Sequence, residues 1–201
     1  MNAYDFDAGD LCLDFANTSN WHASDHPIEG LTGFLDLITW SRQAGVLPPE
    51  AADELQKIAV DQPQEMTRYY DLAIRVREAI YRIFSHRYAG KSIPAADLSI
   101  LNSIVRKAMA HRQLVQSGDE IRWSWTPDVE GVNLILWSVA FAAAHLLASP
   151  LVSRVRECED NRGCGYLFID MSKNHSRRWC SMESCGNRAK ARRHYSRASA
   201  D

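Results

Sequence analysis

Apolar side chains recur every three or four positions along much of residues 1–150, a spacing that predicts amphipathic helices. The clearest predicted helix spans residues 64–89, where an apolar stripe runs from Leu72 to Phe84 and Gly90 follows the end. Similar spacing predicts a helix over residues 31–44 and another that begins at Pro49. A further helix is predicted over residues 94–111, and its inner face carries Leu98, Leu101, Ile104, Val105 and Met109.

Two segments have a different period. Residues 11–15 alternate between apolar and polar side chains, which predicts a short strand followed by a polar turn. Residues 113–125 contain two short apolar runs separated by Ser117, Gly118 and Asp119, the pattern of a β-hairpin. We therefore expect residues 1–152 to form a mainly α domain with a small β element, an α+β fold.

The segment 132–152 approaches the length and apolarity of a membrane span. Asn133, Ser138 and His145 interrupt it, so we expect a helix buried in a domain core and no membrane partner. The N-terminus has no basic stretch followed by a long apolar run, so we expect no signal peptide and a cytoplasmic protein.

Charge divides the chain into two parts. Residues 1–150 contain 12 basic and 19 acidic side chains, whereas residues 151–201 contain 11 basic and 6 acidic ones. The overall charge of −2 therefore conceals −7 in the first part and +5 in the second. This asymmetry predicts a second domain over residues 153–201 that meets an anionic partner.

Four of the five cysteines lie in this second part, with 5, 15 and 4 residues between consecutive members, at Cys158, Cys164, Cys180 and Cys185. Two close pairs joined by a loop can surround one tetrahedral Zn²⁺ ion. Because protein supplies all four ligands, the site would be structural. The remaining cysteine, Cys12, is most simply a small core residue.

Three other interpretations of the cysteines compete with zinc. Disulfides are disfavoured in a chain without a secretion signal. Free buried thiols need an apolar core that residues 158–185 hardly supply, and the spacing differs from that of ferredoxin iron–sulfur sites. A short segment with so few large apolar side chains also gains folding free energy from a bound metal, which favours zinc.

The sequence around these cysteines resembles the CGNR zinc-finger family, named for the run at residues 185–188. Upstream, residues 11–18 (LCLDFANT) resemble the start of the ABATE domain that precedes this finger. The resemblance covers nearly the whole chain. It implies a transcription regulator, stress-induced in the family's description, in which the finger binds DNA.

Basic residues are dense around and after the cysteines, with eight of them and one acid between residues 173 and 197. Part of this charge can neutralise the zinc–thiolate cluster, and the rest favours nucleic acid, DNA above all. A solvated tail, or a contact with the acidic N-terminal domain, is the alternative. The candidate nucleic-acid-binding residues are Lys173, Arg177, Arg178, Arg188, Lys190, Arg192, Arg193 and Arg197, and residues 187–198 should form a basic helix.

Polar and aromatic side chains gather where the first predicted strand ends, at Asp14, Asn17, Thr18, Trp21 and His22. Such a cluster can line a pocket for a small-molecule effector, or it can be a loop that satisfies its own hydrogen bonds. The N-terminal domain is therefore expected to sense a ligand or to form a homodimer.

The sequence is compatible with three functions. The first is a zinc-finger regulator that binds duplex DNA. The second is an RNA-binding module, and the third is a small-molecule-binding protein or enzyme whose finger is structural or joins subunits. The sequence contains no nucleophile elbow, Walker loop or glycine fingerprint, so nothing in it requires enzymatic activity.

Overall fold

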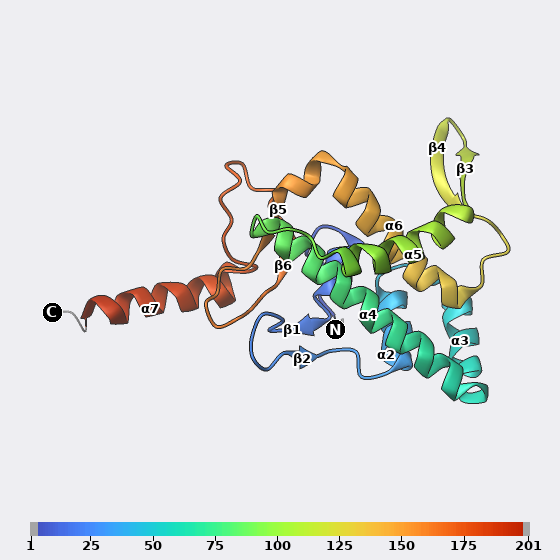
Figure 1. Ribbon diagram of the computed structural model, residues 1–201, viewed down its shortest axis with the longest axis horizontal. Coiled ribbons are helices and arrows are strands. Elements are labelled where there is room, and N and C mark those ends of the chain that lie inside the picture. Colours follow the sequence, from blue (N-terminus) through green and yellow to red (C-terminus); the bar gives the residue numbers. More distant parts are fainter. Residues whose placement is uncertain (1–3, 199–201) are drawn as a thin grey trace.

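The computed structural model describes residues 4–198. For residues 193–198 it describes the backbone alone. Helices dominate the chain as far as residue 148, and short strands accompany them (Figure 1). The elements up to that point are α1 (Leu11–Ala16), β1 (Ser19–Asn20), β2 (Ile28–Glu29), α2 (Phe34–Gln43), α3 (Pro49–Asp61), α4 (Pro63–Tyr88), α5 (Ala95–Ala110), β3 (Arg112–Ser117), β4 (Glu120–Trp125) and α6 (Gly131–Ala148).

The last part of the chain has little regular structure before its final helix. A 3₁₀ turn, η1 (Pro150–Arg154), leads into two short strands, and a π-helical turn precedes the last helix. These elements are β5 (Val155–Glu157), β6 (Leu167–Ile169), η2 (Met182–Gly186) and α7 (Asn187–Ala198). The mainly α fold with small strand pairs is the predicted one.

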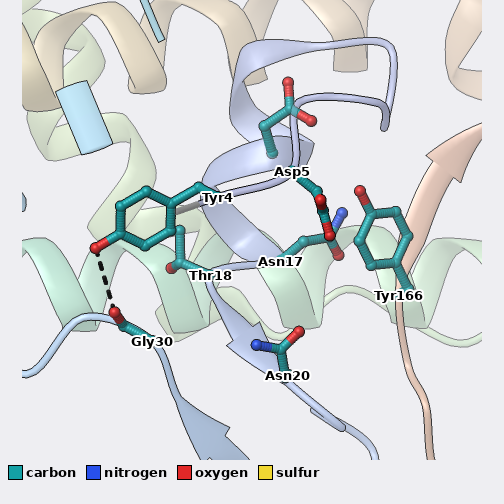
Figure 2. Close-up of a pocket in the computed structure, with 8 residues that line it drawn as sticks. Tyr4, Asp5, Asn17, Thr18, Asn20, Gly30 and Tyr166 are labelled. Carbon is teal, nitrogen blue, oxygen red and sulfur yellow. Dashed lines mark hydrogen bonds between the residues drawn. The ribbon is translucent and has the colours of Figure 1, made fainter. Parts of the chain in front are cut away.

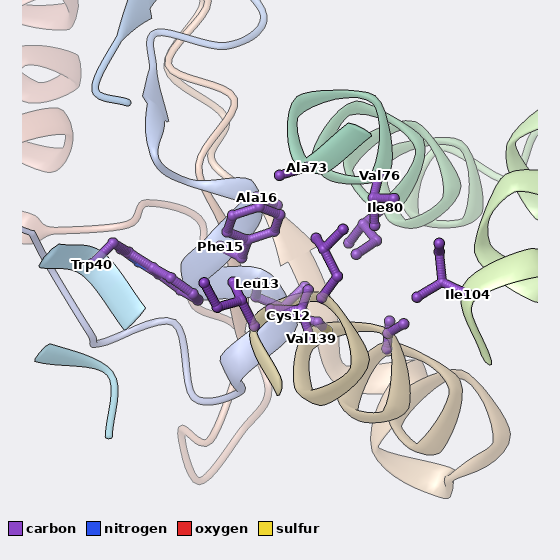
Figure 3. Packing of buried hydrophobic residues seen from close by; sticks show 14 of the residues in the cluster. Cys12, Leu13, Phe15, Ala16, Trp40, Ala73, Val76, Ile80, Ile104 and Val139 are labelled. Atoms are coloured by element: carbon purple, nitrogen blue, oxygen red, sulfur yellow. The ribbon is translucent and has the colours of Figure 1, made fainter. Parts of the chain in front are cut away.

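The predicted strand at residues 11–15 is wrong, because this segment is helix α1. The side chain of Asp10 caps it by accepting a hydrogen bond from the N–H of Cys12 at 3.0 Å. The helix is buried on nearly all sides, so its residues show no helical alternation of apolar and polar positions. Figure 3 shows Leu13 and Phe15 among side chains from α2, α4 and α6, and Cys12 is a core residue as expected.

The long predicted helices are confirmed, and the errors concern single side chains. Helix α4 buries Val76, Ile80 and Phe84 in the core, as the apolar stripe predicted. Leu98 and Met109, placed on the inner face of α5, are instead 39% and 47% exposed. They occupy the edges of the stripe, where packing with a neighbouring helix decides burial.

Helix α6 is the one helix in the described part of the chain that is long and apolar enough to cross a membrane. The core helix of a globular domain meets the same criterion. Here α6 contributes Ile135, Trp137 and Val139 to the central core and packs against α1, α3, α4 and α5.

Within residues 4–198, three separate two-stranded antiparallel sheets complete the fold. The predicted hairpin is β3–β4, in which Leu114 pairs with Trp123, and it projects from the body beside α5 (Figure 1). The sheet β5–β6 pairs Arg156 with Phe168. This sheet packs against α4, and β6 also packs against α1.

The cysteine-containing segment shares the core of the N-terminal part. Val155, Leu167 and Ile169 belong to the same buried cluster as α1 and α4. The N–H of Ile169 also donates to the carbonyl of Ala8 at 2.8 Å. By contrast, α7 packs against η2 and extends away from the body (Figure 1).

Candidate metal centre and its surroundings

The four cysteines come together although the loop between the two pairs is long. Cys158 directly follows β5, Cys164 precedes β6, and Cys180 and Cys185 lie on either side of the start of η2. All four sulfur atoms lie within 4.8 Å of one another. The Sγ atoms of Cys164 and Cys180 are 3.7 Å apart, and those of Cys180 and Cys185 are 3.5 Å apart.

These distances fit a tetrahedral Zn²⁺ ion. With Zn–S bonds of about 2.3 Å, a tetrahedron places its sulfurs about 3.8 Å apart. No pair of these cysteines is bonded as a disulfide. A four-sulfur donor set is one of those that structural zinc sites use, and it leaves no coordination position for a substrate.

The turn that carries the last two ligands is capped from within. Ser181 Oγ accepts hydrogen bonds from the N–H groups of Glu183 and Ser184. Phe168 is fully buried against Cys158 and Cys185, and Trp179 packs on the same cluster. Trp179 therefore shields the sulfurs.

A buried carboxylate next to the sulfurs collects arginines. Asp160, 3% exposed, accepts hydrogen bonds from Arg188 at 3.1 Å and from Arg192 at 3.2 Å. Arg162 lies 3.4 Å from the same carboxylate. Burial alone would raise the pKa of Asp160, but these guanidinium groups hold it well below its usual value.

Arg188 also reaches the metal ligands. Its Nη2 donates to Cys185 Sγ at 2.8 Å, so this arginine joins the thiolate cluster to Asp160. Four thiolates around Zn²⁺ carry a net charge of −2, and Asp160 adds −1. Arg162, Arg188 and Arg192 supply three positive charges, which balance that total locally.

The structure describes the side chains of four other predicted nucleic-acid-binding residues, which divide into two groups. Arg177 donates to the carbonyl oxygens of Trp179 and Cys180 and stacks on Phe168, and Arg178 pairs with Glu159 at 2.6 Å. Lys173 and Lys190 are exposed, and the described residues include no ion-pair partner for either. The side chains of Arg193 and Arg197 lie outside the described residues.

Comparison with known families agrees with this geometry. The ABATE family model, described as "Putative stress-induced transcription regulator", matches residues 9–150. The chain belongs to the ABATE family. The CGNR zinc-finger model matches residues 154–198, which include all four cysteines, so the cluster is that of a structural Zn²⁺ site. A search of curated proteins gave no match.

The loop after β1 of the ABATE domain lies on the CGNR finger. Arg162 and Arg188 lie over the ring of Trp21, with their guanidinium carbons 5.0 and 5.2 Å from its centre. The N–H of His22 donates to the carbonyl of Cys164 at 3.2 Å. Trp21 and His22 therefore hold the finger on the ABATE domain and do not line the predicted pocket.

His22 is fixed by two residues of α4. Its ring stacks on Tyr81 with centroids 3.5 Å apart, and its Nε2 lies 2.9 Å from Glu78. Burial would raise the pKa of Glu78, but His22 and Arg77 lower it to about 2. The Glu78 carboxylate is therefore charged near neutral pH and orients the imidazole against the finger.

Two glycines let the finger backbone approach this loop. Gly163 and Gly165 have φ angles of 86° and 66°, a conformation that other residues rarely adopt. A Cβ atom on Gly165 would lie 2.6 Å from the backbone nitrogen of Ala23. At Gly163 it would lie 2.5 Å from the Cα of Ser24. Both positions therefore require glycine, because their φ angles are positive and because a Cβ atom has no space.

Three of the five predicted pocket residues, Asp14, Asn17 and Thr18, do line a common cavity of about 170 Å³. The cavity lies where α1, the segment before it and the finger meet (Figure 2). Its other lining residues are Tyr4, Asp5, Asn20, Gly30 and Tyr166. Burial and the carboxylates of Asp7, Asp10 and Asp5 raise the pKa of Asp14 to about 6, against the hydrogen bond from Ala8.

The sequence interpretation missed Asp160, Tyr4 and Tyr166. Asp160 could have been noticed as an acid two residues after a cysteine in a basic segment, where it can pair with arginines. Tyr4 and Tyr166 are far apart in sequence and meet only through the docking of β6, so no local pattern indicates them.

Proposed function

We propose that this protein is a transcription regulator that binds duplex DNA through α7. The family description supports a regulatory role, and the observation that carries DNA binding is the nature of α7. Residues 187–198 include five basic residues and no acidic one, and the helix extends away from the body (Figure 1). A free basic helix can lie along phosphates or enter the major groove, where arginine pairs with guanine.

Contacts that hold the start of this helix on the finger support the proposal. A helix of 12 residues with few apolar side chains is marginal by itself. Its first two turns are held by Cys185 as a zinc ligand and by the pairing of Arg188 and Arg192 with Asp160. The zinc finger thus provides a fixed base for α7, which the proposed binding of α7 to DNA requires.

The arginine pairs narrow the set of residues that we assign to DNA. Arg177 is used by the finger itself, while Arg178, Arg188 and Arg192 each have an acidic partner. We therefore propose that the main phosphate contacts come from Lys173, from Lys190 and from the later part of α7. The paired arginines remain 34–57% exposed and contribute a secondary share.

We assign the regulatory part to the ABATE domain, which senses an effector or joins two copies of the chain. A dimer would present two α7 helices, which suits half-sites separated by about one helical turn of DNA. We also propose a cytoplasmic location, because zinc-binding thiols must stay reduced. Sedimentation of the zinc-loaded protein at several concentrations separates monomer from dimer.

The test is fluorescence anisotropy with a labelled duplex, the corresponding single strand and a stem-loop RNA, each at several salt concentrations. About five phosphate contacts give a slope near −4.5 in a plot of log affinity against log salt. We expect the duplex to bind most tightly. Tighter binding of the stem-loop supports an RNA-binding module, and no binding to any probe supports a finger that is only structural.

A matched pair of variants locates the contact surface. Lys190→Ala/Arg193→Ala/Arg197→Ala should weaken duplex binding at least tenfold and reduce the slope by about 2 to 3. Arg106→Ala/Lys107→Ala/Arg122→Ala removes the same charge from exposed positions of the ABATE domain and should change the affinity less than threefold. Equal losses in both variants would contradict a specific role for α7.

A further inference from the structure

We propose that the cavity between α1 and Tyr166 binds a small organic cation with a primary ammonium group, and that its occupancy is coupled to the seating of the zinc finger. This inference deepens the proposed function, because it assigns a ligand class to the regulatory domain. The inference rests on the proposed function only where it predicts that the ligand changes DNA affinity. The ligand site itself is inferred from the geometry of the cavity.

The cavity has the size of a small metabolite. Its volume of about 170 Å³ is well above the roughly 10–15 Å³ that a cavity needs to hold one water molecule, so a ligand of several heavy atoms fits. Figure 2 shows Tyr4 and Tyr166 on opposite sides, with Asn17, Thr18 and Asn20 between them. Two aromatic rings facing a polar floor can hold the alkyl part and the charge of an ammonium compound.

One buried carboxylate in the cavity has a free acceptor. Asp14 is 8% exposed, and its Oδ1 accepts the N–H of Ala8 at 3.0 Å. Its other oxygen has no hydrogen-bond donor among the described residues, although the side chain lines the cavity. This oxygen is not among the buried side-chain atoms that lack a partner, so it is open to the cavity, where a ligand with N–H donors and positive charge can pair with it.

The surrounding charges favour a cation. Asp5, Asp7 and Asp10 lie close enough to Asp14 to raise its pKa, so the cavity has a negative potential. Arg77, which donates to Thr18, is already paired with Glu29 and Glu78. No group of three metal-ligating side chains occurs here in the part of the chain that the structure describes, which favours an organic ammonium over a metal ion.

The same cavity touches the zinc finger. Tyr166 forms one wall and lies two residues after the ligand Cys164, and its hydroxyl donates to Asp7. Asn17 lines the cavity and also hydrogen-bonds the backbone of Leu167 in β6. A ligand that contacts Asn17 and Tyr166 together therefore stabilises the docked finger, and by linkage a docked finger binds the ligand more tightly.

The test uses the full-length zinc-loaded protein with propylammonium as the probe, and 1-propanol and propionate as neutral and anionic analogues of similar size. Calorimetry at pH 7.5 should give saturable binding of propylammonium alone. Asp14→Asn keeps the acceptor for Ala8 and should weaken binding at least tenfold. Asp5→Asn, an exposed position, should weaken it too, whereas Asp53→Asn on α3 should leave it unchanged.

The inference is overturned if propylammonium shows no saturable binding, or if it binds Asp14→Asn and Asp5→Asn as tightly as the wild type. Duplex affinity is then measured with and without saturating propylammonium, and we expect a change of threefold or more. An unchanged duplex affinity overturns the coupling. Failure of all duplex binding refutes the proposed function and leaves the calorimetric result on the site intact.

Discussion

Asn17 and Leu167 are 150 positions apart in the sequence and exchange two hydrogen bonds. The side-chain Nδ2 of Asn17 donates to the carbonyl of Leu167 at 2.8 Å, and the N–H of Leu167 donates to Asn17 Oδ1 at 2.9 Å. The side chain thus pairs with β6 as another strand would. It joins the end of α1 to the segment between two zinc ligands.

Replacing Asn17 should therefore weaken the packing of the finger on the ABATE domain. Asn17→Ala leaves a buried N–H and a buried carbonyl of Leu167 unpaired, which should lower the free energy of unfolding by about 2–4 kcal/mol. Chemical denaturation measures this loss. Asn20→Ala, at an exposed neighbouring position, should change stability by less than about 0.5 kcal/mol. A similar effect of both substitutions would show that the Asn17 pair does not hold β6.

Asp160 should be required for the anchoring of α7. Asp160→Ala leaves Arg162, Arg188 and Arg192 without their shared acceptor, and we expect a loss of about 1–3 kcal/mol because these arginines are partly exposed. Amide exchange in residues 186–192 should become faster. The control is Glu183→Ala, which removes an exposed acid of η2. Unchanged exchange in Asp160→Ala would contradict the proposed anchor.

The long helices and the cysteine cluster could be predicted from the sequence because both depend on local spacing. The stripe from Val76 to Phe84 fixes α4, and the spacing of Cys158, Cys164, Cys180 and Cys185 indicates four ligands of one ion. Helix α1 could not be predicted in this way. It is buried on nearly every side, so it lacks the period that distinguishes a helix from a strand.

The partners of the charged residues could be predicted only in part. The sequence indicated that arginines would neutralise the thiolates, and Arg188 does contact Cys185. It could not indicate that Arg188 also stacks on Trp21, because that contact depends on how the two domains pack. Trp21 and His22 follow the pocket residues in sequence but point to the finger, since the chain turns at Trp21, whose φ angle is 55°.

The stability of the protein should depend on pH through Asp14. Its pKa rises from 3.8 to about 6 on folding, so between these values the folded protein holds a proton that the unfolded chain has released. The free energy of unfolding should therefore fall as the pH rises through this window. Asn cannot ionise, so Asp14→Asn should be the more stable protein above pH 7.

At pH 8 the free energy of unfolding of Asp14→Asn should exceed that of the wild type by about 1–2 kcal/mol. A pKa that rises from 3.8 to about 6 corresponds to about 3 kcal/mol, and solvent in the open cavity screens part of this energy. At pH 4 the two proteins should unfold at the same denaturant concentration. Denaturation curves at both pH values check this. A loss of stability for Asp14→Asn at pH 8 would show that the charged form of Asp14 is stabilised by the fold.

The central claim is that one Zn²⁺ ion held by four cysteines forms the base of α7. Native mass spectrometry of the intact protein, combined with amide exchange, tests it most directly. We expect the mass of one zinc ion, its loss in Cys180→Ser, and rapid exchange of residues 180–190 in that variant. A metal-free wild-type protein in which residues 180–190 remain protected would contradict the claim.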